Sequence, residues 1–147
     1  MNRWVVDASV AVKWFVPEPL SQHAARLLDA AARRAASLAA PDLIVAEFGS
    51  VLVKKQAAGE FAASDTEEML GTFLALPVEI VPSQPLAPAA LAIAICAGCT
   101  FYDALYLAAA QAVEGRLVTA DREFIRLISR TALSDLVLQV KDLPPKP

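Results

Sequence analysis

The chain has 147 residues, a length that suits a single domain with one hydrophobic core. Hydrophobic residues make up 56% of it and the mean hydropathy is +0.47, which excludes global disorder and implies either a large core or an apolar surface covered by a partner. The net charge of −3 gives no overall attraction for nucleic acid phosphates, although basic residues cluster at Arg33 and Arg34, at Lys54 and Lys55, and at Arg116, Arg122, Arg126 and Arg130.

Short apolar runs rich in β-branched residues, bounded by turn formers or charges, predict the strands. They lie at Trp4–Val6, Val78–Val81, Leu117–Val118 and Leu136–Val140, with a further one at Ser37–Ala40 just before Pro41. Stretches of helical period fill the chain between them: Ser21–Ala36, Asp42–Ala58, Ser64–Leu76, Leu86–Ala97, Phe101–Glu114 and Arg122–Arg130.

Capping residues support several of these helix boundaries. Ser64 followed by Glu67, and Thr100 followed by Asp103, both match the capping-box pattern. Pro41 sits where the start of a helix tolerates proline. These signals place helix starts near residues 41, 64 and 100.

Strands that alternate with helices imply crossover connections between parallel strands. We therefore predict an α/β fold with a central parallel sheet of four to five strands and helices on both of its faces. The sequence shows no internal repeat and no second domain. We expect one domain over residues 1–143, followed by a short frayed tail at Pro144–Pro147.

The longest uncharged stretch, Ile80–Tyr102, is long enough to be tested as a membrane span. Three prolines break its first third and most of the remainder is Ala, so we expect a buried helix instead. Near the N-terminus, Asp7 and Lys13 interrupt any apolar region of a signal peptide. We expect a cytoplasmic protein without membrane attachment.

Cys96 and Cys99 form a C-x-x-C pair, a spacing found in zinc sites and redox pairs. No second pair is present to complete a zinc site, and the two cysteines fall in an Ala-rich helical run rather than after a strand. We expect two small core residues.

Two carboxylates follow strands directly. Asp7 ends the apolar run WVV and Asp121 ends the run LVTA. The carboxyl ends of parallel strands share one edge of the sheet, where open α/β folds place their ligands, so both side chains are expected at that edge. Each also has a simpler interpretation as the N-cap of the following helix.

Two further acids lie in apolar helices. Glu47 has apolar or small neighbours one turn away and no basic residue within a turn, so an unpaired charge there would cost several kcal/mol. Asp103 opens a helix that carries no other charge until Glu114. The simpler interpretations are a semi-exposed helix residue for Glu47 and a capping-box member for Asp103.

Taken together, these four acids form the all-oxygen ligand set of a hard cation such as Mg²⁺, and such a site suits phosphodiester hydrolysis. Ser9 and Thr119 flank two of them and are expected either to orient carboxylates or metal-bound water, or to cap helices. His23 is the only histidine, which excludes chemistry based on paired imidazoles, and we expect it on the surface.

Four segments carry a family resemblance: VVDASVAVKWF, PDLIVAEFGSVL, TFYDALYLAAA and GRLVTADREF. In this order and spacing, from about Val5 to Phe124, they resemble the PIN-domain ribonucleases, and specifically the VapC toxins of bacterial and archaeal toxin–antitoxin pairs. The resemblance implies a three-layer α/β/α PIN-like fold, dependence on Mg²⁺ or Mn²⁺, and endonucleolytic cleavage of RNA that leaves a 5′-phosphate. It also implies that Asp7, Glu47, Asp103 and Asp121 hold the metal and position the attacking water, assisted by Ser9 and Thr119.

The same resemblance implies partners. VapC proteins are usually homodimers held inactive by a VapB antitoxin, whose tail enters the acidic groove. A basic residue of that tail would compensate Glu47 in the absence of metal, and an apolar antitoxin helix would cover excess apolar surface.

The sequence also departs from the family pattern. Some relatives carry a further acid shortly after the last Asp; here Arg122 follows Asp121, and Glu123 is a doubtful substitute, which leaves one or two metal ions open. Trp14 and Phe15 are expected in the core rather than stacked on RNA bases. The alternative function is a catalytically inactive PIN-type RNA-binding or scaffold protein, and the presence of all four acids argues against it. The sequence does not identify the RNA that is cut.

Overall fold

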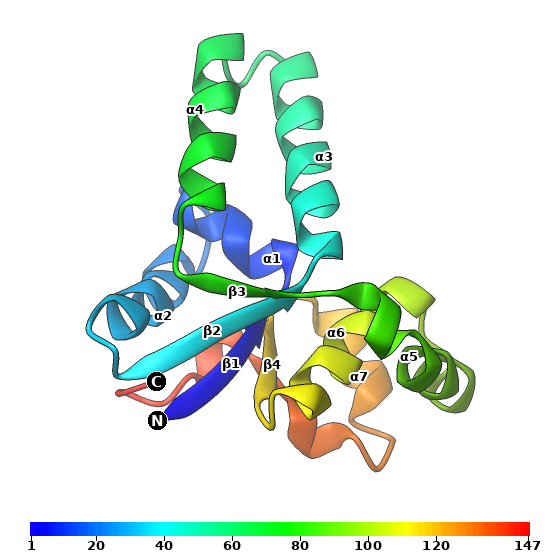
Figure 1. The fold of residues 1–147 in the computed structure, drawn as a ribbon. Helices are drawn as coiled ribbons and strands as arrows, with labels where there is room; N and C mark the ends of the chain where they lie inside the picture. The colour runs from blue at the N-terminus through cyan, green and yellow to red at the C-terminus, as the bar shows by residue number, and fades with distance from the viewer.

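In the computed structural model, which describes residues 1–147, the chain forms a three-layer α/β/α structure around one parallel sheet (Figure 1). The sheet has five strands in the order β3-β2-β1-β4-β5. They are β1 (Asn2–Val6), β2 (Ala36–Pro41), β3 (Val78–Val81), β4 (Arg116–Thr119) and β5 (Val137–Gln139), and every neighbouring pair is parallel. The predicted α/β fold and parallel sheet are confirmed.

Seven α-helices connect the strands: α1 (Ala8–Ala11), α2 (Ser21–Ala32), α3 (Leu43–Ala57), α4 (Ala63–Leu74), α5 (Ser83–Ala97), α6 (Phe101–Ala112) and α7 (Arg122–Ile128). α6 packs across β1, β2 and β4 and is itself covered by α5, whereas α2 and α3 contact β2 beside α1. Figure 1 shows the α3–α4 hairpin projecting from the body of the molecule. From β1 to β3 the chain moves across the sheet in one direction, and after β3 it moves in the other. Because crossovers between parallel strands are right-handed, the connecting helices lie on one face before β3 and on the opposite face after it.

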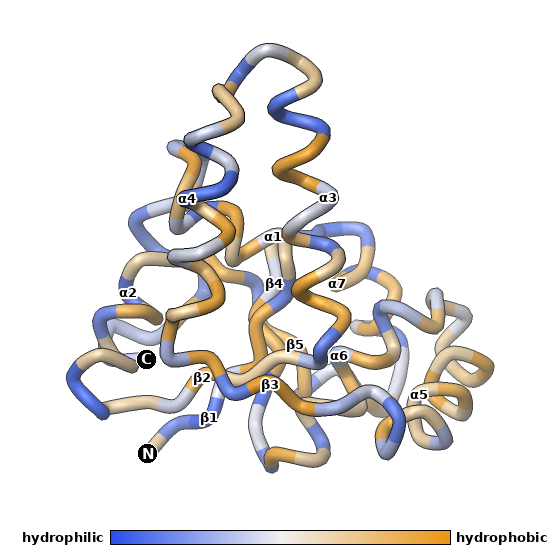
Figure 2. The backbone as a smooth tube through the Cα atoms, turned by 45° about the horizontal axis from the view of Figure 1, so that its top comes forward, coloured by the Kyte–Doolittle hydropathy of each residue, from blue (hydrophilic) through white to orange (hydrophobic).

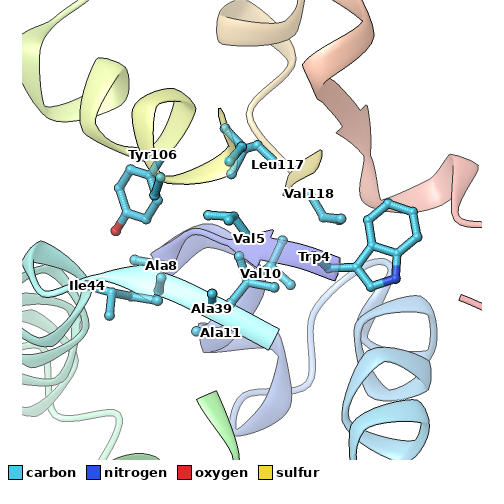
Figure 3. Close-up of a cluster of buried hydrophobic side chains, with 14 of the residues drawn as sticks. Trp4, Val5, Ala8, Val10, Ala11, Ala39, Ile44, Tyr106, Leu117 and Val118 are labelled. Carbon is cyan, nitrogen blue, oxygen red and sulfur yellow. The ribbon is translucent and has the colours of Figure 1, made fainter. Parts of the chain in front are cut away.

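The core forms one cluster of 36 buried hydrophobic residues. β1 lies at its centre with Val5 and Val6 fully buried, and seven consecutive residues of α6, Ala104–Ala110, are buried as well (Figure 3). Hydrophilic residues gather on outer turns, including the far end of the α3–α4 hairpin (Figure 2). At about 1.5 to 3 kcal/mol for each large buried side chain, this core fixes the ends of β1 and β4 firmly.

Several boundaries differ from the prediction. α2 ends at Ala32 rather than Ala36, because β2 already begins at Ala36. Pro41 is the last residue of β2, and the helix expected after it begins at Leu43 with Asp42 as its N-cap. The short α1 helix and the 3₁₀ turn Val12–Trp14 were not predicted, since elements of three or four residues show no periodicity.

The helix caps were predicted correctly at one of two positions. α4 begins at Ala63, and the Asp65 carboxylate accepts the Ala62 N–H at 3.1 Å, so the expected Ser64 cap is wrong. Thr100 does cap α6, accepting the Asp103 N–H at 3.1 Å. The reciprocal bond from the Thr100 N–H to the Asp103 carboxylate is absent.

The uncharged stretch around α5 is only partly buried. Leu91 and Ile95 are 55% and 75% exposed, and Cys96 is exposed while Cys99 is partly buried, so the prediction of two core cysteines is wrong for Cys96. No single helix has the length and hydropathy to cross a membrane; α5 and α6 reach them only as a pair bent by 118°.

The C-terminal tail, Pro144–Pro147, has no helix or strand, and it contacts the body of the molecule. Leu143 is buried, and the Arg26 guanidinium of α2 donates to the carbonyl oxygen of Pro144. The tail is therefore held against α2.

Candidate active site

The predicted acids lie where the strand order reverses. From β1 the chain proceeds through β2 to β3 on one side, and β4 and β5 lie on the other, so the switch point falls between β1 and β4. Val6 pairs with Val118 in this parallel register, which places Asp7 beside Thr119 just beyond the sheet. In open α/β folds the crevice at this point is where ligands bind.

Asp7 is bonded through both carboxylate oxygens. Oδ1 accepts hydrogen bonds from the Ser9 hydroxyl and from the Val10 N–H, the latter at 3.1 Å, and Oδ2 accepts one from the Thr119 hydroxyl. The bond from Val10 makes Asp7 the N-cap of α1. Helix capping and a place in the acidic site are therefore compatible at this residue.

Ser9 and Thr119 join the ends of β1 and β4. The Ser9 hydroxyl accepts the Ala120 N–H at 3.0 Å, and the Thr119 hydroxyl accepts the Asp121 N–H at 3.1 Å. Both hydroxyl protons go to Asp7, so the 3.4 Å contact between the two hydroxyl oxygens is not the bond that holds them. The hydroxyl groups orient a carboxylate as expected; their use in catalysis stays a prediction.

Glu47 faces the site from α3. Its neighbours Ile44 and Phe48 are buried, while Glu47 itself is half-buried on the flank of the helix. Its Oε1 accepts a hydrogen bond of 3.0 Å from the hydroxyl of Tyr106 on α6. The compensation that a buried carboxylate needs therefore comes from a neutral hydroxyl and not from a basic residue.

Tyr106 was not predicted as a site residue. The signal available in the sequence was a tyrosine one helical turn after Asp103, inside a run of residues that are otherwise apolar. A buried tyrosine hydroxyl usually finds a hydrogen-bond partner, and an acid on the same helix face marks where that partner would lie.

Asp103 and Asp121 complete the cluster from the first turns of two helices. The Asp103 carboxylate lies beside the Thr100 side chain, whose hydrogen bonding opposes the effect of burial on its pKa. Asp121 is the N-cap of α7 and accepts the Phe124 N–H at 3.0 Å through Oδ1, while its side chain is exposed.

The four acids repel one another. Burial, with a smaller contribution from the charge of Glu47, raises the pKa of Asp7 to about 6 in spite of hydrogen bonds from Ser9, Thr119 and Val10. Burial also raises the pKa of Glu47 and of Asp103, with added repulsion from Asp103 on the first and from Asp121 on the second.

These couplings connect all four predicted acids as neighbours. The three ion pairs of the chain, Lys13–Glu18, Lys55–Glu60 and Glu123–Arg126, involve none of them. The site is therefore a concentration of negative charge without a basic partner.

The donor set fits a hard cation better than a soft one, because it holds carboxylates and hydroxyls and no histidine or cysteine. No three of the acids lie close enough to be ligands of one ion at the same time. Mg²⁺ commonly binds through one or two carboxylates and keeps several waters, so this spacing suits a partly hydrated ion.

Other candidates lie outside the cluster. Glu123 is exposed and paired with Arg126 at 3.2 Å, so nothing joins it to the four acids. The largest cavity, about 550 Å³ between α3 and α4, includes none of them. Phe15 packs against Phe48 with ring centroids 5.2 Å apart, and the Trp14 indole donates to the Ala24 carbonyl at 2.9 Å, so both aromatic residues have structural roles as predicted.

Comparisons with known proteins agree with this arrangement. The PIN domain family model matches residues 4–128. Over 123 residues the chain is 35% identical to Ribonuclease VapC3 of Pyrobaculum aerophilum, an alignment covering 81% of this chain and 89% of that protein.

Solved structures are similar over most of their length. The crystal structure of PAE2754 from Pyrobaculum aerophilum has a TM-score of 0.69 and 26% identity, covering 95% of this chain and 92% of that one. VapBC2 from Rickettsia felis, solved bound to a DNA fragment from the promoter, has a TM-score of 0.67 and 16% identity over 93% and 98% of the two chains. The second likeness concerns the fold alone.

Proposed function

The chain belongs to the PIN-domain family, and we propose that it is a metal-dependent endoribonuclease, the toxin of a VapBC-type toxin–antitoxin pair acting in the cytoplasm. The resemblance noted in the sequence is thereby confirmed at the level of the family. One observation supports the proposed activity: four carboxylates without basic partners lie near the switch point of the sheet, and negative charge couples Asp7 to Glu47, Glu47 to Asp103 and Asp103 to Asp121. The identity to a ribonuclease over most of the chain supports the same reaction.

We propose Mg²⁺, or Mn²⁺, as the cofactor. When bound, such an ion supplies positive charge to the attacked phosphate and lowers the pKa of a coordinated water. Of Asp7, Glu47, Asp103 and Asp121, one or two would bind the ion directly and the others would bind its water molecules. Oε2 of Glu47 accepts no hydrogen bond within the chain, so this oxygen is free to bind the ion or its waters.

The remaining residues would prepare these carboxylates. Ser9 and Thr119 keep Asp7 in one orientation, and their donated hydrogen bonds favour its ionised form. The exposed Arg122, adjacent to Asp121 and without an acidic partner, would contact a phosphate of the RNA backbone. An acidic site repels RNA unless a cation neutralises it, so binding and cleavage should both depend on the divalent ion.

We further propose that the chain forms a homodimer and binds a VapB-type antitoxin. The exposed apolar side chains of Val53, Leu74, Leu91 and Ile95 provide surface for such partners. An antitoxin that places a basic side chain in the acidic site would neutralise it without metal, and would thereby exclude both cation and RNA.

The activity is tested directly with purified protein. We expect cleavage of RNA in Mg²⁺ and none in chelator, and we expect Asp7→Asn or Asp103→Asn to lose at least about 100-fold in rate while circular dichroism shows an intact fold. Equal cleavage by these variants and by wild type would reject the assignment and favour an inactive PIN-type RNA-binding or scaffold protein. Expression of the toxin should arrest growth unless its antitoxin is co-expressed.

A further inference from the structure

Tyr106 is the one buried polar side chain that reaches the acidic cluster from the core of α6. The residue is 3% exposed, and Figure 3 shows its hydroxyl oxygen pointing away from α6, towards the side on which Ala8 and Ile44 lie. The backbone of α6 is fixed against β1, β2 and β4. The position of the hydroxyl is therefore set by a helix that packs on the central sheet.

Glu47 needs such an anchor. Its side chain has three rotatable bonds, and the negative charges of Asp7 and Asp103 on either side repel it from the site. The hydrogen bond from Tyr106, 3.0 Å long, is the only one that its carboxylate accepts within the chain. It engages Oε1 and leaves Oε2 free.

The chemistry of the donor is suited to a cation site. The donor is the hydroxyl of a phenol, which bonds Glu47 without bringing a charge to the site. A lysine or arginine at the same place would also hold Glu47, but it would cancel one negative charge and compete with a metal ion. The hydroxyl orients the carboxylate and leaves the charge of the site intact.

We propose that Tyr106 is a positioning residue whose hydroxyl holds Oε1 of Glu47, keeps Oε2 available at the acidic site, and thereby sets the affinity of that site for a divalent cation. This rests on the proposed function, since it concerns the same site. It goes beyond that function by assigning a role to a residue that is neither an expected ligand nor an expected catalytic group.

The test is Tyr106→Phe, which removes one oxygen and keeps the ring. Binding of Mn²⁺ without RNA, followed by electron paramagnetic resonance, should weaken by about tenfold or more, as is typical when a partner that orients a ligand is lost. Tyr102→Phe is the matched control, because Tyr102 lies one turn earlier on the same helix, is 63% exposed and makes no side-chain hydrogen bond. It should bind Mn²⁺ as wild type does.

A double-mutant cycle separates positioning from a general effect on packing. In a Glu47→Gln background, Tyr106→Phe should have little further effect on Mn²⁺ affinity, because the carboxylate it positions is gone. Equal affinity of Tyr106→Phe and wild type, the same loss in both backgrounds, or no Mn²⁺ binding by wild type would each overturn the proposal. RNA cleavage is measured separately: weakened Mn²⁺ binding without any wild-type cleavage would reject the proposed function and retain the role of Tyr106.

Discussion

Replacing Asp7 by Asn should stabilise the metal-free protein at neutral pH while abolishing its activity. The pKa of Asp7 is raised from 3.8 to about 6, first by burial and further by the charge of Glu47. The folded state therefore binds this proton more tightly than the unfolded state does. The stability that the proton provides is fully present below pH 3.8 and is lost as the pH rises through 6.

The size of the effect follows from the shift. One pKa unit corresponds to about 1.4 kcal/mol, so the upper value for this carboxyl is roughly 3 kcal/mol. Asp7 is partly exposed to solvent, and water therefore screens its charge. We expect the substitution to raise the free energy of unfolding by about 1 to 2 kcal/mol, which corresponds to about 3 to 6 °C in Tm. Asn retains an oxygen that can accept from Ser9 and Val10, and its amide can donate to the Thr119 hydroxyl oxygen.

The assay is urea unfolding of wild type and Asp7→Asn in chelator at pH 4 and at pH 7.5. The difference in free energy of unfolding between the two proteins removes the contributions of other groups, because those groups titrate alike in both. When the pH is raised from 4 to 7.5, we expect the free energy of unfolding of Asp7→Asn to increase by about 1 to 2 kcal/mol relative to that of wild type. Asp29→Asn, on an exposed part of α2, shows what the same substitution does outside the site. A difference that stays constant, or moves towards wild type at high pH, would refute the reasoning.

Three further outcomes are expected. Mg²⁺ should raise the free energy of unfolding of wild type, by about 1.4 kcal/mol at ten times its Kd, and should do so much less in Asp7→Asn; an equal gain in both would exclude Asp7 from the site. Thr119→Val should cost about 1 to 3 kcal/mol at pH 7.5 and raise the pKa of Asp7 above 6, measured by NMR, because the carboxylate loses a donor. Gly115→Ala should destabilise by about 1 to 3 kcal/mol in thermal unfolding, because its Cβ would lie 2.5 Å from the Arg3 carbonyl oxygen; an unchanged Tm would show that the backbone moves aside easily.

The sequence predicted the architecture because its signals are local. Short β-branched runs alternate with helical periods, and chain connectivity then implies parallel strands. From this, the placement of Asp7 and Asp121 at one edge of the sheet followed without any knowledge of side-chain contacts. The edge became a switch point only once the strand order was known, and strand order depends on long-range pairing that no local pattern reveals.

The contacts within the site could not be predicted for the same reason. Glu47 and Tyr106 are 59 residues apart, and their hydrogen bond depends on the rotation of two helices about their axes. Pro41 lies between two elements: it ends β2, where it pairs with Val81 of β3, and α3 follows with Asp42 as its N-cap. The Thr100 cap was predicted correctly because its hydrogen bond is formed entirely within one helical turn.

Stability and function oppose each other at this acidic edge. The core fixes β1, α3 and α6, and burial and the neighbouring negative charges raise the pKa of the carboxylates at these elements, those of Asp7, Glu47 and Asp103. The capping bonds at Asp7 and Asp121, and the donors Ser9, Thr119 and Tyr106, offset part of this cost without adding positive charge. Any ligand that brings positive charge to the edge should therefore stabilise the fold as it binds. A cation and a basic antitoxin residue would each relieve the same repulsion, so they would compete for the same site.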